Sequence, residues 1–107
     1  MSMRHVKILR PNRVRMIEKP FAWIPFRLLT DGLLGNLSIH AKALYFFLCL
    51  VADRDGVSFY GDKRIQMLLH FETADLGEAR AQLIDNDLVA YDGRIYQVLS
   101  LPAPPSP

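Results

Sequence analysis

The sequence predicts a small α+β domain built from helices, one short strand and a C-terminal β-hairpin. Three observations lead to this fold class. A strongly apolar helical stretch lies near the middle of the chain, two shorter helical stretches follow it, and two strand-like runs are joined by Asp-Gly near the end. The 107 residues have room for one compact domain. Half of them are apolar or aromatic, which is typical of a chain with an ordered core.

Charge is distributed unevenly along the chain. Residues 1–19 carry six Lys or Arg and one Glu, a net charge of +5, whereas the remainder carries seven Lys or Arg and ten Asp or Glu, a net charge of −3. We interpret residues 1–19 as a basic N-terminal arm, residues 20–101 as the folded domain and residues 102–107 as a disordered proline-rich tail.

The longest apolar run, residues 43–52, has ten residues, against about 20 for a membrane-crossing helix. The N-terminus is basic and lacks the apolar region and cleavage site of a secretory signal. We therefore expect a cytoplasmic location and no membrane contact. The single cysteine, Cys49, lies inside the apolar run and is expected to be a buried structural thiol.

The domain is expected to begin with an extended segment between Pro20 and Pro25. Its large apolar side chains should anchor the chain to the core: Phe21, Trp23 and Ile24. Pro25 suits the first position of a short helix, because proline lacks only a donor that the first turn leaves unpaired anyway. This helix should stop near Gly32 or Gly35.

The main helix is predicted after Ser38, a residue type that favours the N-cap, and is closed by residues 53–56. Apolar residues follow helical spacing at Leu44, Phe47, Leu48 and Val51. Other faces are also apolar, at Tyr45, Phe46 and Cys49. A helix of this kind has to be covered on all sides, either by the N-terminal segment or by a second copy of the protein.

Two further helices follow a short strand predicted over residues 57–60. The first, over residues 62–71, places Ile65, Leu68 and Leu69 on one side. The next is expected to be capped by Thr73 and to bury one stripe of side chains: Leu76, Ala79, Leu83 and Ile84.

The hairpin is the clearest local signal. Residues 88–91 and 94–101 read as strands, and the Asp92-Gly93 dipeptide between them suits a two-residue loop with positive backbone angles. The resulting order is helix, strand, helix, helix, hairpin. This is the topology of a winged helix-turn-helix domain, with residues 57–60 as a third strand and Asp92-Gly93 as the tip of the wing.

The stretch from Ile24 to Leu101 also resembles a known family. The residues that carry the resemblance are Leu37-Ser38 followed by Ala-Lys-Ala-Leu-Tyr at 41–45, and Leu83-Ile84 with Leu88-Val89 before the wing. They are similar to the winged-helix domains of bacterial phage, plasmid and mobile-element replication initiators and associated regulators. The resemblance implies DNA binding through the third helix, aided by the wing, in replication or transcription.

The expected reading helix departs from that pattern in its charge. Residues 72–87 contain five acidic residues and a single basic one, Arg80. Helical spacing turns the following residues outward: Ala74, Glu78, Ala81, Gln82 and Asp85. Phosphates repel such a face, and most affinity for DNA comes from neutralising phosphates. Contacts with DNA therefore have to come largely from other residues.

We expect the arm to contact phosphates or a minor groove through Arg4, Lys7, Arg10, Arg13 and Arg15. Lys63, Arg64 and Arg94 should steady the domain on the duplex. Gln82 could pair with adenine, and Arg80 could meet a nucleotide or a neighbouring carboxylate. The other interpretation of the arm is a solubilising tail or an extra strand, with Val6, Ile8 and Leu9 packed on the domain.

Other classes of function find no support in the sequence. His5, His40 and His70 have no partner at the spacing of a metal site, and no nucleophile, base and orienting group can be nominated, so no cofactor, metal or enzymatic activity is expected. The alternative to DNA binding is a protein-interaction module. In it, the acidic third helix and the excess apolar surface of the main helix would form a partner or homodimer interface.

Overall fold

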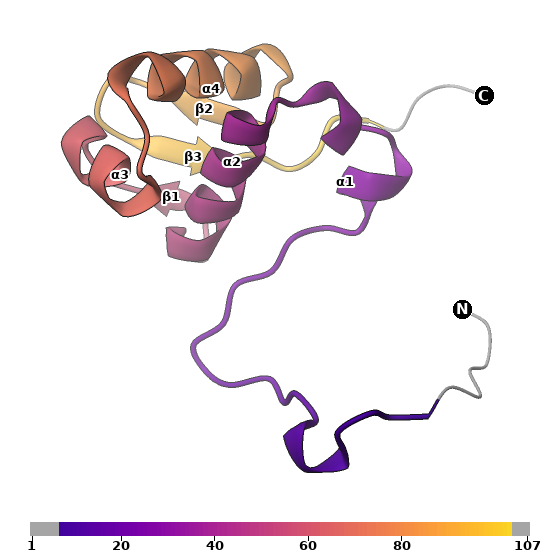
Figure 1. The fold of residues 1–107 in the computed structure, drawn as a ribbon. Helices are drawn as coiled ribbons and strands as arrows, with labels where there is room; N and C mark the ends of the chain where they lie inside the picture. Colours follow the sequence, from indigo (N-terminus) through magenta and orange to yellow (C-terminus); the bar gives the residue numbers. More distant parts are fainter. Residues whose placement is uncertain (1–6, 104–107) are drawn as a thin grey trace.

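The computed structural model describes residues 7–103 and confirms the predicted α+β class (Figure 1). Four α-helices and three strands form within these residues. In chain order the elements are the 3-10 turn η1 (Pro11–Arg13), α1 (Arg27–Thr30), the 3-10 turn η2 (Leu34–Asn36), α2 (Ile39–Val51), β1 (Val57–Ser58), α3 (Asp62–Leu69), α4 (Thr73–Asp85), β2 (Val89–Tyr91) and β3 (Tyr96–Val98).

The three strands form one antiparallel sheet in the order β1-β3-β2. Val57 lies opposite Gln97, and Val89 lies opposite Val98. The hairpin and its third strand are therefore present as predicted, although β1 has two residues where four were expected. In Figure 1 the helices α2, α3 and α4 and the sheet make up the left half of the molecule, and the chain before α1 runs away from them.

Helix α2 lies at the centre of the core. The Ser38 hydroxyl caps it as predicted, accepting a hydrogen bond of 3.1 Å from the Ala41 amide. Leu44 and Leu48 are fully buried. The core around them is completed by side chains from every other large element: Ile65, Leu76, Leu83, Leu88 and Tyr96. The face of α2 that carries Tyr45 and Cys49 is also buried.

The turn between α3 and α4 is short and depends on one residue in an unusual conformation. His70 has φ 58° and ψ 44°, the left-handed region, and the Phe71 amide then donates back to the Gln66 carbonyl at 3.0 Å. This arrangement ends α3 and turns the chain directly into α4. The predicted cap of α4 at Thr73 is wrong by one residue. Glu72 is the N-cap, in a capping box with Asp75.

The end of α4 explains why the predicted burial of Ile84 is wrong. Asp87 has φ 61°, and the Leu88 amide donates to the Leu83 carbonyl at 3.0 Å, which folds Leu88 under the helix. Leu88 is fully buried, whereas Ile84 is 42 % exposed. Ile84 was expected in the buried stripe, but Leu88 takes that place in the core.

The expected anchoring of residues 20–25 is also wrong. Phe21 is 60 % exposed and Trp23 is 72 % exposed, and Ile24 is exposed as well. Leu28, in α1, is the first buried side chain among the described residues. It packs in the core together with Leu37, whereas Ile39, Phe46 and Leu50 of α2 stay exposed, so the preceding segment does not cover that side of the helix. The helix α1 ends before Gly32, as predicted, since Gly32 adopts φ 76°.

The hairpin turn differs from the predicted one by one position. The Asp92 amide donates to the Ile95 carbonyl at 3.3 Å, so the tight turn is centred on Gly93 and Arg94. Of Asp92 and Gly93, only Gly93 has a positive φ, of 97°. The Asp92 carboxylate instead accepts from the amides of Arg94 and Ile95, at 2.9 and 2.7 Å. A side-chain acceptor thus replaces the expected positive angle at Asp92.

Candidate nucleic-acid interface

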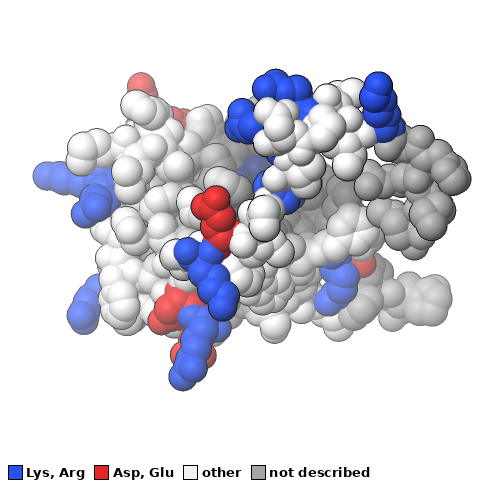
Figure 2. Space-filling model, turned by 90° about the horizontal axis from the view of Figure 1, so that it is seen from below, with Lys and Arg blue, Asp and Glu red and all other residues white. Residues whose placement is uncertain are grey.

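The basic arm lies apart from the core and keeps its charges exposed. Lys7, Arg10, Arg13 and Arg15 are all exposed, and Arg4 lies outside the described residues. Between residues 7 and 103, none of these four forms an ion pair with a carboxylate. Figure 2 views the molecule from the side to which the arm extends, and basic side chains gather along its upper edge with few acidic ones among them. Four unpaired cations are therefore accessible to phosphates.

The arm does not add a strand to the domain. Ile8 is 57 % exposed and Leu9 is 88 % exposed, so neither side chain packs on the core, and Val6 lies outside the described residues. The η1 turn is stabilised only by a bond from the Arg13 amide to the Arg10 carbonyl, at 2.9 Å. The described part of the arm therefore does not form the packed extra strand, and its interpretation as a solubilising tail stays a prediction.

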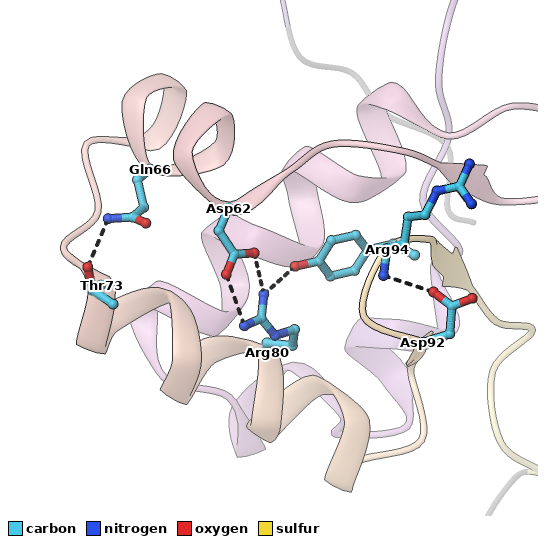
Figure 3. A network of polar contacts seen from close by, with 7 residues as sticks. Asp62, Gln66, Thr73, Arg80, Asp92 and Arg94 are labelled. Atoms are coloured by element: carbon cyan, nitrogen blue, oxygen red, sulfur yellow. Dashed lines mark hydrogen bonds and ion pairs between the residues drawn. The ribbon is translucent and has the colours of Figure 1, made fainter.

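Arg80, the one basic residue of α4, points inward and is engaged in the fold. Its guanidinium donates to the Asp62 carboxylate at 2.8 Å and to the Tyr96 hydroxyl at 2.7 Å (Figure 3). It also lies over the ring of Tyr91, 4.6 Å from the ring centre. Arg80 thereby joins the start of α3, the middle of α4 and both strands of the hairpin, and its side chain is only 20 % exposed.

The hydrogen bonds of Arg80 offset the free-energy cost of burying its charge. Burial works against the charge of Arg80, but the bonds with Asp62 and Tyr96 outweigh it and raise the pKa of the guanidinium. Burial also raises the pKa of the Tyr96 phenol, against the opposing effect of Arg80. Arg80 is consequently charged and Tyr96 neutral in the fold. A nucleotide contact through Arg80 would require its bonds with Asp62 and Tyr96 to break.

Gln82 is also directed toward the protein. Its side-chain oxygen accepts a short hydrogen bond from the Ser38 amide, which links α4 to the start of α2. On the outer face of α4, Glu78 and Asp85 are exposed, as predicted. Arg80 and Gln82, the two residues of α4 expected to reach DNA, thus both serve internal contacts. The exposed face of α4 carries carboxylates and no cation.

The remaining candidates stay on the surface. Lys63 and Arg64 are exposed in the first turn of α3, and the Arg64 guanidinium lies 5.6 Å from the ring centre of Tyr60. Arg94 is exposed in the turn of the hairpin, where its amide is held by Asp92 (Figure 3). Two of these cations lie side by side in α3 and the third lies in the hairpin turn, so the domain offers a few separate contacts and the arm a concentrated group.

Sequence reasoning missed the partners of Arg80. Asp62 precedes it by 18 residues and Tyr96 follows it by 16, so no helical or strand spacing relates them. The only local hint was that one cation lay among five carboxylates in residues 72–87. A single cation among several carboxylates indicates that an ion pair could form within the fold. The sequence does not identify the partner, because Asp62 and Tyr96 meet Arg80 only in the tertiary structure.

The described part of the chain holds neither a cluster of metal-ligating side chains nor a helix that could span a membrane. Residues 7–103 contain no group of three or more His, Cys, Asp or Glu side chains arranged to hold a metal ion. None of the helices in that range is long and apolar enough to cross a membrane. Comparisons with protein-family models, curated proteins and solved structures returned no match.

Proposed function

We propose that this chain is a winged helix-turn-helix protein that binds DNA through its basic arm, as a regulator of replication or transcription in a bacterium or mobile element. The arm residues Arg4, Lys7, Arg10, Arg13 and Arg15 contact phosphates or a minor groove. Lys63, Arg64 and Arg94 hold the domain against the duplex. The binding has little intrinsic selectivity for sequence, because its main contacts go to the backbone.

The topology supports the winged-helix part of this proposal. The helices α3 and α4 are joined by three residues, and the hairpin β2–β3 pairs with β1. A three- or four-residue turn between two helices is typical of a helix-turn-helix, and a hairpin that follows the second of these helices is compatible with a wing. The first turn of α3, with Lys63 and Arg64, is where such a motif commonly approaches the DNA backbone.

One observation carries the DNA-binding part. The arm keeps Lys7, Arg10, Arg13 and Arg15 exposed and unpaired, while the single cation of α4 is bound to Asp62. Charges that serve only solubility do not need to be concentrated in one segment. A group of unpaired cations on an extended segment is the arrangement that neutralises a line of phosphates.

The test is binding of a fluorescent mixed-sequence duplex to the full chain and to a variant with Arg10→Gln, Arg13→Gln and Arg15→Gln. We expect binding of the duplex to weaken by at least about tenfold, since each lost phosphate contact removes a counterion-release contribution. The matched control is Arg54→Gln, an exposed cation of the domain outside the proposed surface. Equal loss in the control, or no loss in the arm variant, contradicts the proposal.

A second candidate function is a protein-interaction module that forms a homodimer. The observation that favours it is an apolar stripe on α2: Ile39 is 79 % exposed, Phe46 57 % and Leu50 56 %. Exposed carboxylates on α4, at Glu78 and Asp85, also suit a protein partner better than a phosphate backbone. In this function the arm contributes solubility and the domain binds no DNA.

Mass measurement across a concentration series distinguishes the two functions. A dimer held by α2 should dissociate when Phe46→Glu or Leu50→Glu is introduced, whereas Met67→Glu, an exposed change on α3, should leave it intact. A monomeric mass at all concentrations, together with DNA binding, leaves only the first function.

A further inference from the structure

A cavity of about 660 Å³ lies between the extended segment before α1, the end of α2 and the chain after β3. Phe21 and Trp23 form one wall, Tyr45, Cys49 and Ala52 form a second, and the segment 98–101 forms a third. A volume between about 300 and 1,000 Å³ is typical of sites for small molecules. The aromatic and aliphatic walls favour an apolar ligand.

Four charged residues line this cavity, Arg27, Asp53, Arg54 and Asp55, and their charges sum to zero. The Arg27 guanidinium bonds to Asp31 at 2.9 Å and to the Pro102 carbonyl at 2.7 Å. The Asp53 carboxylate accepts from the amides of Asp55 and Val57, each at 2.9 Å. A charged ligand would meet no net opposite charge and would have to compete with the bonds of Arg27 and Asp53, so the cavity favours a neutral molecule.

Tyr45 provides one polar group without a partner. Its side chain is 2 % exposed, and its hydroxyl is buried with no hydrogen-bond partner among the described residues. The hydroxyl lies next to the thiol of Cys49, a side chain that lines the same cavity. Sulfur is a weak acceptor and does not satisfy a phenol. An unsatisfied buried hydroxyl is costly, so an acceptor supplied by a ligand would relieve that cost.

The protonation states of Tyr45 and Cys49 determine what the two side chains can do for a ligand. Burial raises the pKa of the Tyr45 phenol well above its ordinary value, so the hydroxyl keeps its proton and can donate it. Burial likewise raises the pKa of the Cys49 thiol, which therefore stays protonated and does not act as a nucleophile. The cavity is thus equipped for reversible binding.

We infer that this cavity binds a small, flat, neutral aromatic molecule that carries one hydrogen-bond acceptor. The rings of Phe21 and Trp23 cover the apolar body of the ligand, and the Tyr45 hydroxyl donates to its acceptor. This site shares no residue with the proposed DNA contacts, so it stands or fails independently of the DNA-binding proposal.

The test compares quinoline and naphthalene, which have the same shape and differ by one ring nitrogen that accepts a hydrogen bond. Both are titrated into the full chain, and binding is followed by the indole N–H resonance of Trp23, the only tryptophan. We expect saturable shifts with both, and a binding constant for quinoline roughly two- to tenfold higher, the effect of one hydrogen bond to a buried group.

Two variants locate the bound molecule. Tyr45→Phe should abolish the preference for quinoline and retain naphthalene binding, whereas Tyr60→Phe, which removes a hydroxyl outside this cavity, should preserve the preference. Ala52→Leu, which fills the cavity, should weaken both ligands. The absence of saturable shifts at Trp23 overturns the inference. A preference for quinoline that survives Tyr45→Phe overturns it as well.

Discussion

The guanidinium of Arg80 donates to the carboxylate of Asp62 at 2.8 Å and so ties the middle of α4 to the first turn of α3. The same guanidinium reaches the buried Tyr96 hydroxyl in the hairpin. The one cation of the expected reading helix thus holds the two helices and the hairpin in place relative to one another.

Replacement of Arg80 should lower the free energy of unfolding, whereas the affinity of the folded protein for DNA should change little. Asp62 is 46 % exposed, and an exposed ion pair contributes only about 0–1 kcal/mol. The larger effect comes from the Tyr96 hydroxyl, because a buried group left without its partner costs about 1–3 kcal/mol. Urea unfolding of Arg80→Gln should show a loss of about 1–3 kcal/mol.

The double variant Arg80→Gln with Tyr96→Phe separates the two contributions. If the hydroxyl is the main cause, the second change should recover part of the lost stability, because no unsatisfied phenol remains. Additive losses in the two single variants would show that the contact with Tyr96 is not the source of the effect. Asp62→Asn should cost less than Arg80→Gln.

The left-handed turn between α3 and α4 predicts a stabilising substitution. His70 has φ 58°, a conformation that costs a residue with a β-carbon about 1 kcal/mol or more relative to glycine. His70→Gly should therefore raise the free energy of unfolding by up to about 1 kcal/mol, while His70→Ala should not. Thermal unfolding of the two variants side by side tests this. A lower melting temperature for His70→Gly would mean that the imidazole makes a contact that outweighs the strain.

Gly56 should tolerate no side chain. It has φ 87°, and a β-carbon at this position would lie 2.5 Å from the Val98 carbonyl oxygen. The Gly56 carbonyl also accepts from the Val98 amide at 2.8 Å, so any shift weakens the contact between the turn before β1 and the end of β3. Gly56→Ala should lower the melting temperature by about 8 °C or more, the effect of about 2 kcal/mol in a domain of this size.

Gly77 is the matched control for Gly56. It lies inside α4, and a β-carbon there would meet nothing within 4 Å. Gly77→Ala should raise stability by up to about 1 kcal/mol, because alanine favours a helix interior. Comparable losses from both substitutions would contradict the close approach of Gly56 to Val98.

The hairpin turn predicts a low pKa for Asp92. Hydrogen bonds from the Ile95 and Arg94 amides favour the carboxylate and lower the pKa. The stability from this turn is therefore fully present above the unfolded pKa of about 3.9 and is lost as pH falls through the lower folded value. A titration followed by the carboxyl carbon resonance of Asp92 should give a midpoint below that of an unstructured peptide. An unshifted midpoint would mean that these two bonds are absent in solution.

The elements were predictable because their signals are local. The Ser38 cap, the apolar spacing of α2 and the two strand-like runs each depend on residues within a few positions of one another. The wrong predictions concern positions where the local pattern allows two residues to be buried and only the tertiary structure decides between them. Leu88 displaced Ile84 from the core only because Asp87 reversed the chain.

In the candidate site, too, features that depend on local sequence were predictable and features that depend on tertiary contacts were not. The exposed cations of the arm follow from the sequence, because six of them share a single nearby acid, Glu18. The engagement of Arg80 by Asp62 and Tyr96 joins residues 16 to 18 positions apart. The cavity beside Tyr45 depends on the path of residues 21–25, which apolar character alone predicted to be buried.

The most direct test of the central claim is the salt dependence of duplex binding by the full chain. If five arm cations neutralise phosphates, the logarithm of the binding constant should fall as the logarithm of salt concentration rises, and the arm alone should contribute about −4 to −5 to the slope. Neutralising Arg10, Arg13 and Arg15 should reduce that slope by about 3. Binding that is insensitive to salt, or a slope unchanged in the arm variant, would contradict a DNA contact made by the arm.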